Sequence, residues 1–343
     1  MLDLRDVYQR GLVRLEVGKA AQMILERVVA GDDRGMDIEE AVRSDKFFTT
    51  QIITQASAAM KKSEVNSLSH AAVLLGHEMV RDFILGHTVQ RLVDRAADAR
   101  FESFSKSREY LERAHAAESL AARMNNEYTG LALAAGFVFD VFERWLLSDS
   151  ALNKHFGPFA HEIWTHSYRT AAIAWAISSH ERIQVKYKRI VLAAAILHDV
   201  GKLFLACCYP EKYLPLLKKM EESVRDEIDE MTHVRLETEQ FDFSHAELGS
   251  LLFAKFTFLE ELEGVIDFHH DFSVLKTRDP DMFILSMILH LADRLAWLSQ
   301  VQANYEVTDV KKILEPYRHS FPLFADEVTA MMVTLRGKSL LPS

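Results

Sequence analysis

The sequence predicts an all-α protein, and three observations lead to this prediction. The 343 residues include only 7 prolines and 13 glycines, which suits a mostly helical chain. Apolar residues recur at intervals of three and four, as they do on one face of a helix. No segment alternates apolar and polar residues in the manner of a half-buried strand. With 49% hydrophobic residues, the chain is able to bury the cores of two or three domains.

Charge, hydropathy and cysteine content argue against several classes of protein. The net charge of −10 argues against a broad nucleic-acid surface. The longest apolar runs, such as residues 190–197, are too short to span a bilayer, and the N-terminal MLDLRDVYQR lacks the apolar core of a signal peptide. Cys207 and Cys208 are the only cysteines, and adjacent cysteines rarely form a structural disulfide. We therefore expect a cytoplasmic protein with reduced cysteines and no membrane association.

The N-terminal part predicts several short amphipathic helices. VGKAAQMILERVV (17–29) has apolar residues at helical spacing, and GDDRG (31–35) predicts a break after it. A second helix is expected in DIEEAVRSDKFFTTQIITQAS (37–57), and Ser67 can cap a third helix that begins near Leu68. Three histidines in or near the third helix lack the spacing of a compact ligand set, which predicts structural or surface roles for His70, His77 and His87.

Residues 101–153 predict a further helical block that resembles a later part of the chain. In each part, a helix with a histidine is followed by an apolar helix that ends in a pair containing aspartate. The first part has His115 and then Phe139–Asp140, and the second has His166 and then His198–Asp199. Two interpretations are open: an internal repeat whose first copy has lost the histidine of the pair, or two similar amphipathic hairpins.

The remainder of the chain predicts more helices and one charged connection. EESVRDEIDEMTHVRLETEQ (221–240) is expected to form a solvated helix and its connection. Three helix-like segments follow, and each carries metal-binding side chains: FSHAELGSLLFAKF (243–256), LEGVIDFHHDF (262–272) and FILSMILHLADRLAWL (283–298). Pro316 and Pro322 precede EVTAMMVTLRG (327–337), whose apolar face predicts a packed C-terminal helix.

Eight side chains able to bind metal fall in these largely apolar helices. They are Glu162, His166, His198, Asp199, His245, His269, His270 and Asp293. Burying an ionised carboxylate such as Asp199 is costly unless a cation compensates it, and Lys202 or a metal ion could do so. Glu162 and His166 are four residues apart, so one face of a helix presents both. Five histidines and three carboxylates in such helices indicate a common site.

The chemistry of this donor set indicates which metals suit it. Imidazole and carboxylate donors without thiolate suit iron, manganese or zinc. Asp199 could bridge two ions, and paired ions polarise a phosphoryl oxygen and generate hydroxide near neutral pH, as in phosphoester hydrolysis. Gly249, one turn after His245, would let that helix pack closely.

The ordered series H…HD…H…HH…D, centred on HDVGK, resembles the HD superfamily of metal-dependent phosphohydrolases. It is most similar to the HDOD branch, the HD-related output domain of bacterial signalling proteins. The segments that carry this resemblance are SLSHAAVLLGHEMVRDFIL (67–85), AAAILHDVGKLFL (193–205), FDFSHAELGSLL (241–252) and VIDFHHDF (265–272). The resemblance covers roughly residues 15–300.

The resemblance implies a role for each matching position. The first histidine of the superfamily is His166, and the HD pair is His198–Asp199. The later ligands are His245, His269, His270 and Asp293. Glu162 stands where the related HD-GYP cyclic di-GMP phosphodiesterases place an additional metal-ligand glutamate. Lys202 resembles the lysine that faces the phosphate, and Arg169 is expected to support a metal ligand or contact a substrate or cofactor. Two or more divalent transition-metal ions are implied.

One departure separates the chain from the cyclic di-GMP enzymes. After His269–His270 the sequence reads DFSVLKTRDPDMF, without the GYP-type loop that helps to form their substrate pocket. Many HDOD proteins also act as relays that gather signalling partners or a ligand. The departure therefore favours a regulatory output module, while the complete ligand set favours an active phosphohydrolase.

The sequence thus predicts four regions and two competing functions. The regions are an N-terminal helical module (1–100), a helical linker or degenerate HD-like repeat (101–153), a metal-bearing HD domain (154–305) and a helical tail (306–343). The first function is a signalling protein that binds metal, protein partners and a nucleotide or cyclic dinucleotide. The alternative is a phosphohydrolase in which Asp199 and Lys202 are catalytic. The oligomeric state is not predicted.

Overall fold

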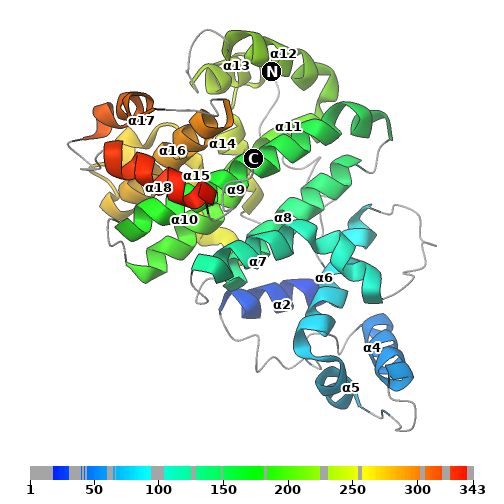
Figure 1. Ribbon diagram of the computed structural model, residues 1–343. Coiled ribbons are helices and arrows are strands. Elements are labelled where there is room, and N and C mark those ends of the chain that lie inside the picture. The colour runs from blue at the N-terminus through cyan, green and yellow to red at the C-terminus, as the bar shows by residue number, and fades with distance from the viewer. Residues whose placement is uncertain are drawn as a thin grey trace.

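Figure 1 shows the computed structural model of the chain. It describes residues 18–30, 40, 42, 45–59, 65, 67–93, 104–124, 129–147, 150–180, 184–224, 231–253, 257–301, 306–318 and 325–337. Within these ranges all regular elements are helical, which confirms the predicted all-α class. The break predicted at 31–35, the side chain of Cys207 and Pro322 lie outside the residues described.

The described residues of the N-terminal part include the helices α2 (Lys19–Val29), α4 (Lys46–Ala59), α5 (Leu68–Leu75) and α6 (His77–Val93). The predicted cap is present, because the Ser67 hydroxyl accepts a hydrogen bond from the backbone N–H of His70 at 3.1 Å. The expected single third helix is two helices, separated at Gly76. Its φ of 86° is a left-handed conformation that glycine adopts without strain, and it ends α5.

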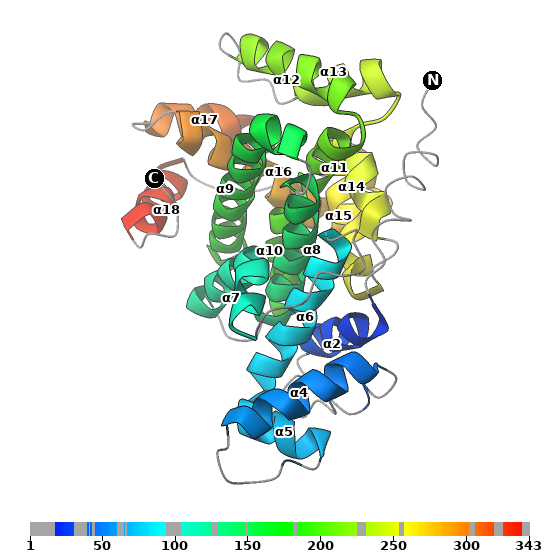
Figure 2. The ribbon, with the colours of Figure 1, turned by 90° about the vertical axis from the view of Figure 1, so that its right-hand side faces the viewer.

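The centre of the molecule is built from long apolar helices. They follow a 3-10 turn, η1 (Phe104–Leu111), and are α7 (Glu112–Met124), α8 (Thr129–Leu147), α9 (Ser150–His180), α10 (Val185–Leu197) and α11 (Val200–Cys208). Figure 2 shows α8, α9 and α10 side by side in the middle of the fold, where they pack against one another. Their alanine-rich and aliphatic faces are almost wholly buried, so this layer forms the core that supports the site.

The hairpin of α7 and α8 uses its polar side chains for packing. Asp140 accepts hydrogen bonds from the backbone N–H groups of Arg113 and Ala114, at 3.0 and 2.8 Å. The Arg113 guanidinium pairs with Glu143 through two hydrogen bonds of 2.8 and 2.7 Å, and it lies over the ring of Trp164 on α9 at 5.2 Å. These contacts join the first half of the chain to the helix that carries His166.

The C-terminal half adds further helical elements around α9 and α10. In order they are α12 (Pro210–Val224), α13 (Met231–Phe241), α14 (His245–Phe253), η3 (Thr257–Leu262), α15 (Glu263–Asp267), η4 (Phe272–Leu275), α16 (Pro280–Val301), α17 (Val307–Leu314), η5 (Glu315–Tyr317) and α18 (Ala325–Gly337). The C-terminal helix predicted at 327–337 is α18. The stretch predicted as solvated at 221–240 includes α13, and there the prediction is wrong for Glu237, which is fully buried.

Helix α16 combines length, apolar composition and burial. Among the described residues, Pro280–Gln300 is the segment long and apolar enough to cross a membrane by those two criteria alone. The prediction from uninterrupted apolar runs overlooked it, because Asp293 and Arg294 divide its sequence. In the fold 72% of this segment is buried, and α16 packs against α9 and α10 as part of the core.

Candidate metal centre

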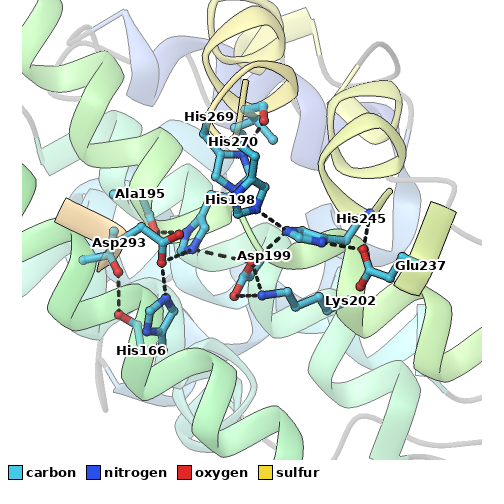
Figure 3. A network of polar contacts seen from close by, with 12 residues as sticks. His166, Ala195, His198, Asp199, Lys202, Glu237, His245, His269, His270 and Asp293 are labelled. Atoms are coloured by element: carbon cyan, nitrogen blue, oxygen red, sulfur yellow. Dashed lines mark hydrogen bonds and ion pairs between the residues drawn. The ribbon is translucent and has the colours of Figure 1, made fainter. Parts of the chain in front are cut away.

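Seven of the eight predicted ligands converge from six parts of the fold (Figure 3). His166 comes from α9 and Asp293 from α16. His198 ends α10, Asp199 precedes α11, His245 begins α14, and His269–His270 follow α15. Most of these side chains thus lie at helix ends, where the backbone changes direction and neighbouring ligands can turn toward one point.

The ligand atoms form three overlapping groups. In each group the atoms that could bind a metal all lie within 4.8 Å of one another. The groups are His166–His198–Asp293, His198–Asp199–His269 and His245–His269–His270. Because the groups share His198 and His269, they form one continuous centre. Buried imidazole and carboxylate groups at these separations are compatible with binding of divalent metal.

Asp199 occupies a helix N-terminus without capping it. An aspartate at this position commonly accepts a hydrogen bond from the backbone N–H groups of the first turn. The Asp199 side chain forms no such bond with α11. Its Oδ1 atom instead lies 3.5 Å from Nε2 of His198 and 3.3 Å from Nε2 of His245. The carboxylate is therefore directed at the histidines.

Backbone carbonyls fix the orientation of two histidines. The Nδ1 atom of His198 lies 2.9 Å from the carbonyl oxygen of Ala195, and that of His269 lies 2.6 Å from the carbonyl oxygen of Ile266. A carbonyl oxygen only accepts hydrogen bonds, so Nδ1 carries the proton in each ring. In the neutral imidazole, Nε2 then presents its lone pair to the centre.

Three buried ring nitrogens in the centre make no hydrogen bond with any described residue. They are Nε2 of His198, Nε2 of His269 and Nδ1 of His270. Buried polar atoms are nearly always hydrogen-bonded, and leaving one without a partner is costly. His198 and His269 belong to one ligand group together with Asp199, whose Oδ1 atom has the Lys202 ammonium as a partner at 2.8 Å. This donor set fits a metal ion, which would take both Nε2 atoms as ligands.

Glu237 was missed by the sequence reasoning, yet it orients His245. Its Oε2 atom accepts hydrogen bonds from Nδ1 and the backbone N–H of His245, at 2.6 and 2.8 Å, while Oε1 accepts one from the Tyr213 hydroxyl at 3.0 Å. A carboxylate behind a histidine fixes its tautomer and raises its basicity. In the sequence nothing distinguishes Glu237 from the exposed Glu239 on the same helix.

Lys202 supplies a positive charge beside Asp199. Its Nζ atom lies 2.8 Å from both carboxylate oxygens. Burial would raise the pKa of Asp199, but the charges of His198, Lys202 and His245 outweigh it and hold that pKa well below its usual value. Burial would likewise lower the pKa of Lys202, and Asp199 with Asp293 raises it instead. Both groups are therefore ionised at neutral pH.

The histidines differ in how readily they take a proton. Burial lowers the pKa values of His269 and His270 far below the ordinary value, and the neighbouring imidazoles lower them further. Both rings are neutral near pH 7, the form that binds metal. For His198, burial would lower the pKa, but the charges of Asp199 and Asp293 outweigh it and raise the pKa.

Two predicted site residues lie apart from the three groups. Glu162 is exposed on α9 and belongs to none of them. Arg169 is buried on α9, one turn beyond His166, and its pKa is lowered by burial and by the charge of Arg336 on α18. The predicted role of Glu162 as an additional metal ligand stays a prediction, and so does that of Arg169, which is expected to support a metal ligand or contact a substrate or cofactor.

The close packing of α11 against α14 explains why the HDVGK motif has a glycine at position 201. A Cβ atom at Gly201 would overlap the backbone carbonyl of His245, so only glycine allows α11 to approach α14 this closely. The sequence placed the close approach at Gly249, but a Cβ there would meet its nearest atom at 3.6 Å, an ordinary contact. The glycine after the HD pair thus brings His245 to Asp199.

An all-helical fold that gathers an HD pair, further histidines and an aspartate defines a protein of the HD superfamily. The family model for the HDOD domain matches residues 17–149 and 147–272, and the chain therefore belongs to the HDOD family. The first segment contains the α7–α8 hairpin and the second contains α9, α10 and α11. The division into the four predicted regions stays a prediction.

Comparison with solved structures gives one further likeness. A crystal structure of a protein named "Putative phosphohydrolase from Shewanella amazonensis SB2B" aligns with 98% of this chain and 96% of its own, at 15% identity and a TM-score of 0.48. A comparison with curated proteins finds no match.

Proposed function

We propose that this HDOD protein is a bacterial signalling protein whose HD centre binds divalent transition-metal ions, and that the metal-bound centre has a regulatory output. The observation that supports the metal most directly is the pair of buried Nε2 atoms, on His198 and His269, that have no hydrogen bond with any described residue. A bound ion would accept both, with Asp199, as ligands and neutralise the charge that Asp199 and Asp293 bring into the core.

The donor set limits the identity and number of the ions. Nitrogen and carboxylate oxygen donors without thiolate suit iron, manganese or zinc. Two ions fit better than one, because seven ligands in three overlapping groups exceed the four that a single tetrahedral ion takes. When bound, such ions supply Lewis-acid chemistry and a water of lowered pKa.

The burial of the centre favours a regulatory role over turnover. The side chains of His198 and His245 have no solvent exposure, and Asp199 and Asp293 have 4% each. A phosphoester substrate must reach the ions, whereas a structural or regulatory ion needs no such access. The absence of the GYP-type loop from the sequence after His270 points the same way. The proposed partners of this regulatory protein are signalling proteins, and its proposed ligand is a nucleotide or cyclic dinucleotide.

Phosphoester hydrolysis is the second candidate, and Lys202 favours it. The Lys202 side chain is 15% exposed at the edge of the centre, and its Nζ atom lies 2.8 Å from Asp199. A lysine placed there would stabilise negative charge that develops on a phosphate in the transition state. In this alternative Asp199 holds the ions and Lys202 contacts the substrate, so both are catalytic.

Hydrolysis assays separate the two candidates. Metal-loaded wild type, Asp199→Ala and Lys202→Ala are tested on cyclic dinucleotides and an aryl phosphodiester, in manganese, iron and zinc. Lys212→Ala, an exposed lysine on α12, is the control. The regulatory proposal expects wild-type activity no higher than that of Asp199→Ala. Activity that requires both Asp199 and Lys202, but not Lys212, would replace it with the hydrolase.

A further inference from the structure

The segment beyond both matched HDOD segments reaches back to the metal centre. The second match ends at residue 272, whereas α17 and η5 cover Val307–Leu314 and Glu315–Tyr317. Tyr317, the last residue of η5, lies with its hydroxyl 2.9 Å from Nε2 of His290 on α16. The other ring nitrogen of His290, Nδ1, lies 2.9 Å from the backbone carbonyl oxygen of His269.

The chemistry of the groups fixes the direction of both hydrogen bonds. The His269 carbonyl can only accept, so Nδ1 of His290 carries the proton and donates it. Nε2 of His290 is then an acceptor, and the Tyr317 hydroxyl donates to it. His290 is 5% exposed, and burial lowers its pKa to about 4, which agrees with a neutral ring. The chain of bonds therefore runs from Tyr317 to His290 to the backbone of His269.

Aromatic packing holds the same three elements together. The ring of Phe272, in η4, lies 5.3 Å from that of His290 and 5.8 Å from that of Tyr317, between ring centroids. His290 and Tyr317 are themselves 5.5 Å apart. Phe272 follows His269–His270 by two residues, so this cluster anchors the ligand segment on its C-terminal side.

His269 is thus held on two sides. Its ring is oriented by the carbonyl of Ile266, at 2.6 Å, and its own carbonyl is held by His290. A shift in the backbone of His269 would move Nε2 away from Asp199 and His198, since the ring is bound to the same short segment. Groups that hold a ligand in this way control metal affinity without touching the metal.

We propose that His290 and Tyr317 are positioning residues for His269, so that the segment from α17 to η5 is part of the metal centre. This inference rests on the proposed metal binding. It assigns a function to a region that the HDOD family model does not match.

A metal titration of the full-length protein tests the inference. The affinity for Co²⁺, and for Zn²⁺ by competition, is measured for wild type, Tyr317→Phe, His290→Leu and His290→Asn. The visible spectrum of bound Co²⁺ reports the ligand geometry directly. The control is Tyr187→Phe, which removes another tyrosine hydroxyl that contacts α16, through Asp281 at 2.5 Å. Thermal unfolding in chelator measures the stability of each apo-protein.

The expected loss of Co²⁺ affinity grows with the number of hydrogen bonds that a variant removes. His290→Leu removes both bonds and should weaken Co²⁺ binding by about 10- to 100-fold, with a changed spectrum. His290→Asn should recover part of the affinity, because its side-chain N–H can replace Nδ1 as the donor to His269. Tyr317→Phe should lose less than His290→Leu and leave the apo-protein as stable as Tyr187→Phe does.

Each of the other possible outcomes contradicts one part of this account. If wild type binds Co²⁺ and Tyr317→Phe and His290→Asn bind it as tightly with the same spectrum, the positioning role is wrong while metal binding stands. If Tyr187→Phe and Tyr317→Phe lost the same Co²⁺ affinity, the contact between Tyr317 and His290 would contribute only general packing and the positioning role would be wrong. Failure of wild type to bind either ion would overturn the proposed function and this inference together. Tyr317→Phe keeps the test decisive if His290→Leu does not fold.

Discussion

His166 and Asp293 are 127 residues apart in the chain, yet Nε2 of His166 lies 2.5 Å from Oδ1 of Asp293. The same oxygen lies 3.4 Å from Nε2 of His198. One carboxylate atom therefore faces two imidazoles that come from α9 and from the end of α10. This contact exists because α16 packs along α9, so the centre closes only when the C-terminal half has folded onto the core.

Glu237 should control metal affinity through His245. Glu237→Gln replaces the carboxylate that accepts the Nδ1 proton of His245, and we expect about a 10- to 100-fold weaker metal affinity. Glu239→Gln is the matched control, because Glu239 lies on the same helix with its side chain 65% exposed. Competition titrations with a chelator measure both. Equal affinities in the two variants would show that Glu237 serves packing only.

Gly201 and Gly249 should respond in opposite ways to the same substitution. In Gly201→Ala the new methyl group overlaps the carbonyl of His245, which should cost about 1 to 3 kcal/mol of unfolding free energy. In Gly249→Ala the methyl group has room, and the higher helix propensity of alanine should leave stability unchanged or raise it by up to about 1 kcal/mol. Denaturant unfolding of the apo-proteins measures both, and a tolerated Gly201→Ala would contradict the close packing of α11 and α14.

Stability should fall between neutral and alkaline pH because of His115. Its Nε2 atom lies 3.2 Å from Asp82 and its Nδ1 atom 3.3 Å from Glu118, and hydrogen bonds to these two carboxylates raise its pKa from 6.5 to about 9. The protonated ring stabilises the fold fully below about pH 6.5, and this contribution is lost as the pH rises through about 9.

The free energy of unfolding should fall by about 2 kcal/mol across this pH window. The loss is no larger because the His115 ring is partly exposed, so solvent screens its interaction with Asp82. Unfolding of wild type and of His115→Asn is compared from pH 6 to pH 10. The difference between them should shrink across this window. The exposed His161 provides the control His161→Asn, and an equal trend in that variant would remove the assignment to His115.

The cysteines should have no part in the metal centre. The Cys208 side chain is half-buried and packs against the core. Replacing Cys207 and Cys208 together by serine should leave the metal content unchanged, because the proposed ligands are nitrogen and oxygen atoms. Metal analysis beside a circular dichroism spectrum checks this. Loss of metal from a folded variant would mean that the ligand set is misplaced.

The sequence could predict what depends on spacing and on residue type. The all-α class follows from apolar periodicity, and the Ser67 cap follows from local hydrogen bonding. The HD pair and the later histidines are visible because imidazole and carboxylate groups are unusual in apolar helices. These features are local, so a single segment contains all the information that each requires.

What the sequence could not predict depends on contacts between distant segments. The burial of Glu237 depends on how α13 lies against α14, and no pattern within 221–240 marks it. The close approach falls at Gly201 instead of Gly249 because α11 and α14 meet at one backbone atom. The bond from Tyr317 to His290 joins residues of two helices whose packing no periodicity defines.

The central claim is that the buried centre holds divalent metal, and metal analysis of the purified protein tests it most directly. The protein is grown with iron, manganese and zinc, purified without chelator and analysed beside Asp199→Ala. We predict about two ions per chain in wild type, as in paired-metal sites, and a sharp loss in Asp199→Ala. Fewer than about one ion for every ten wild-type chains would contradict the claim, because a preformed set of buried ligands binds metal tightly.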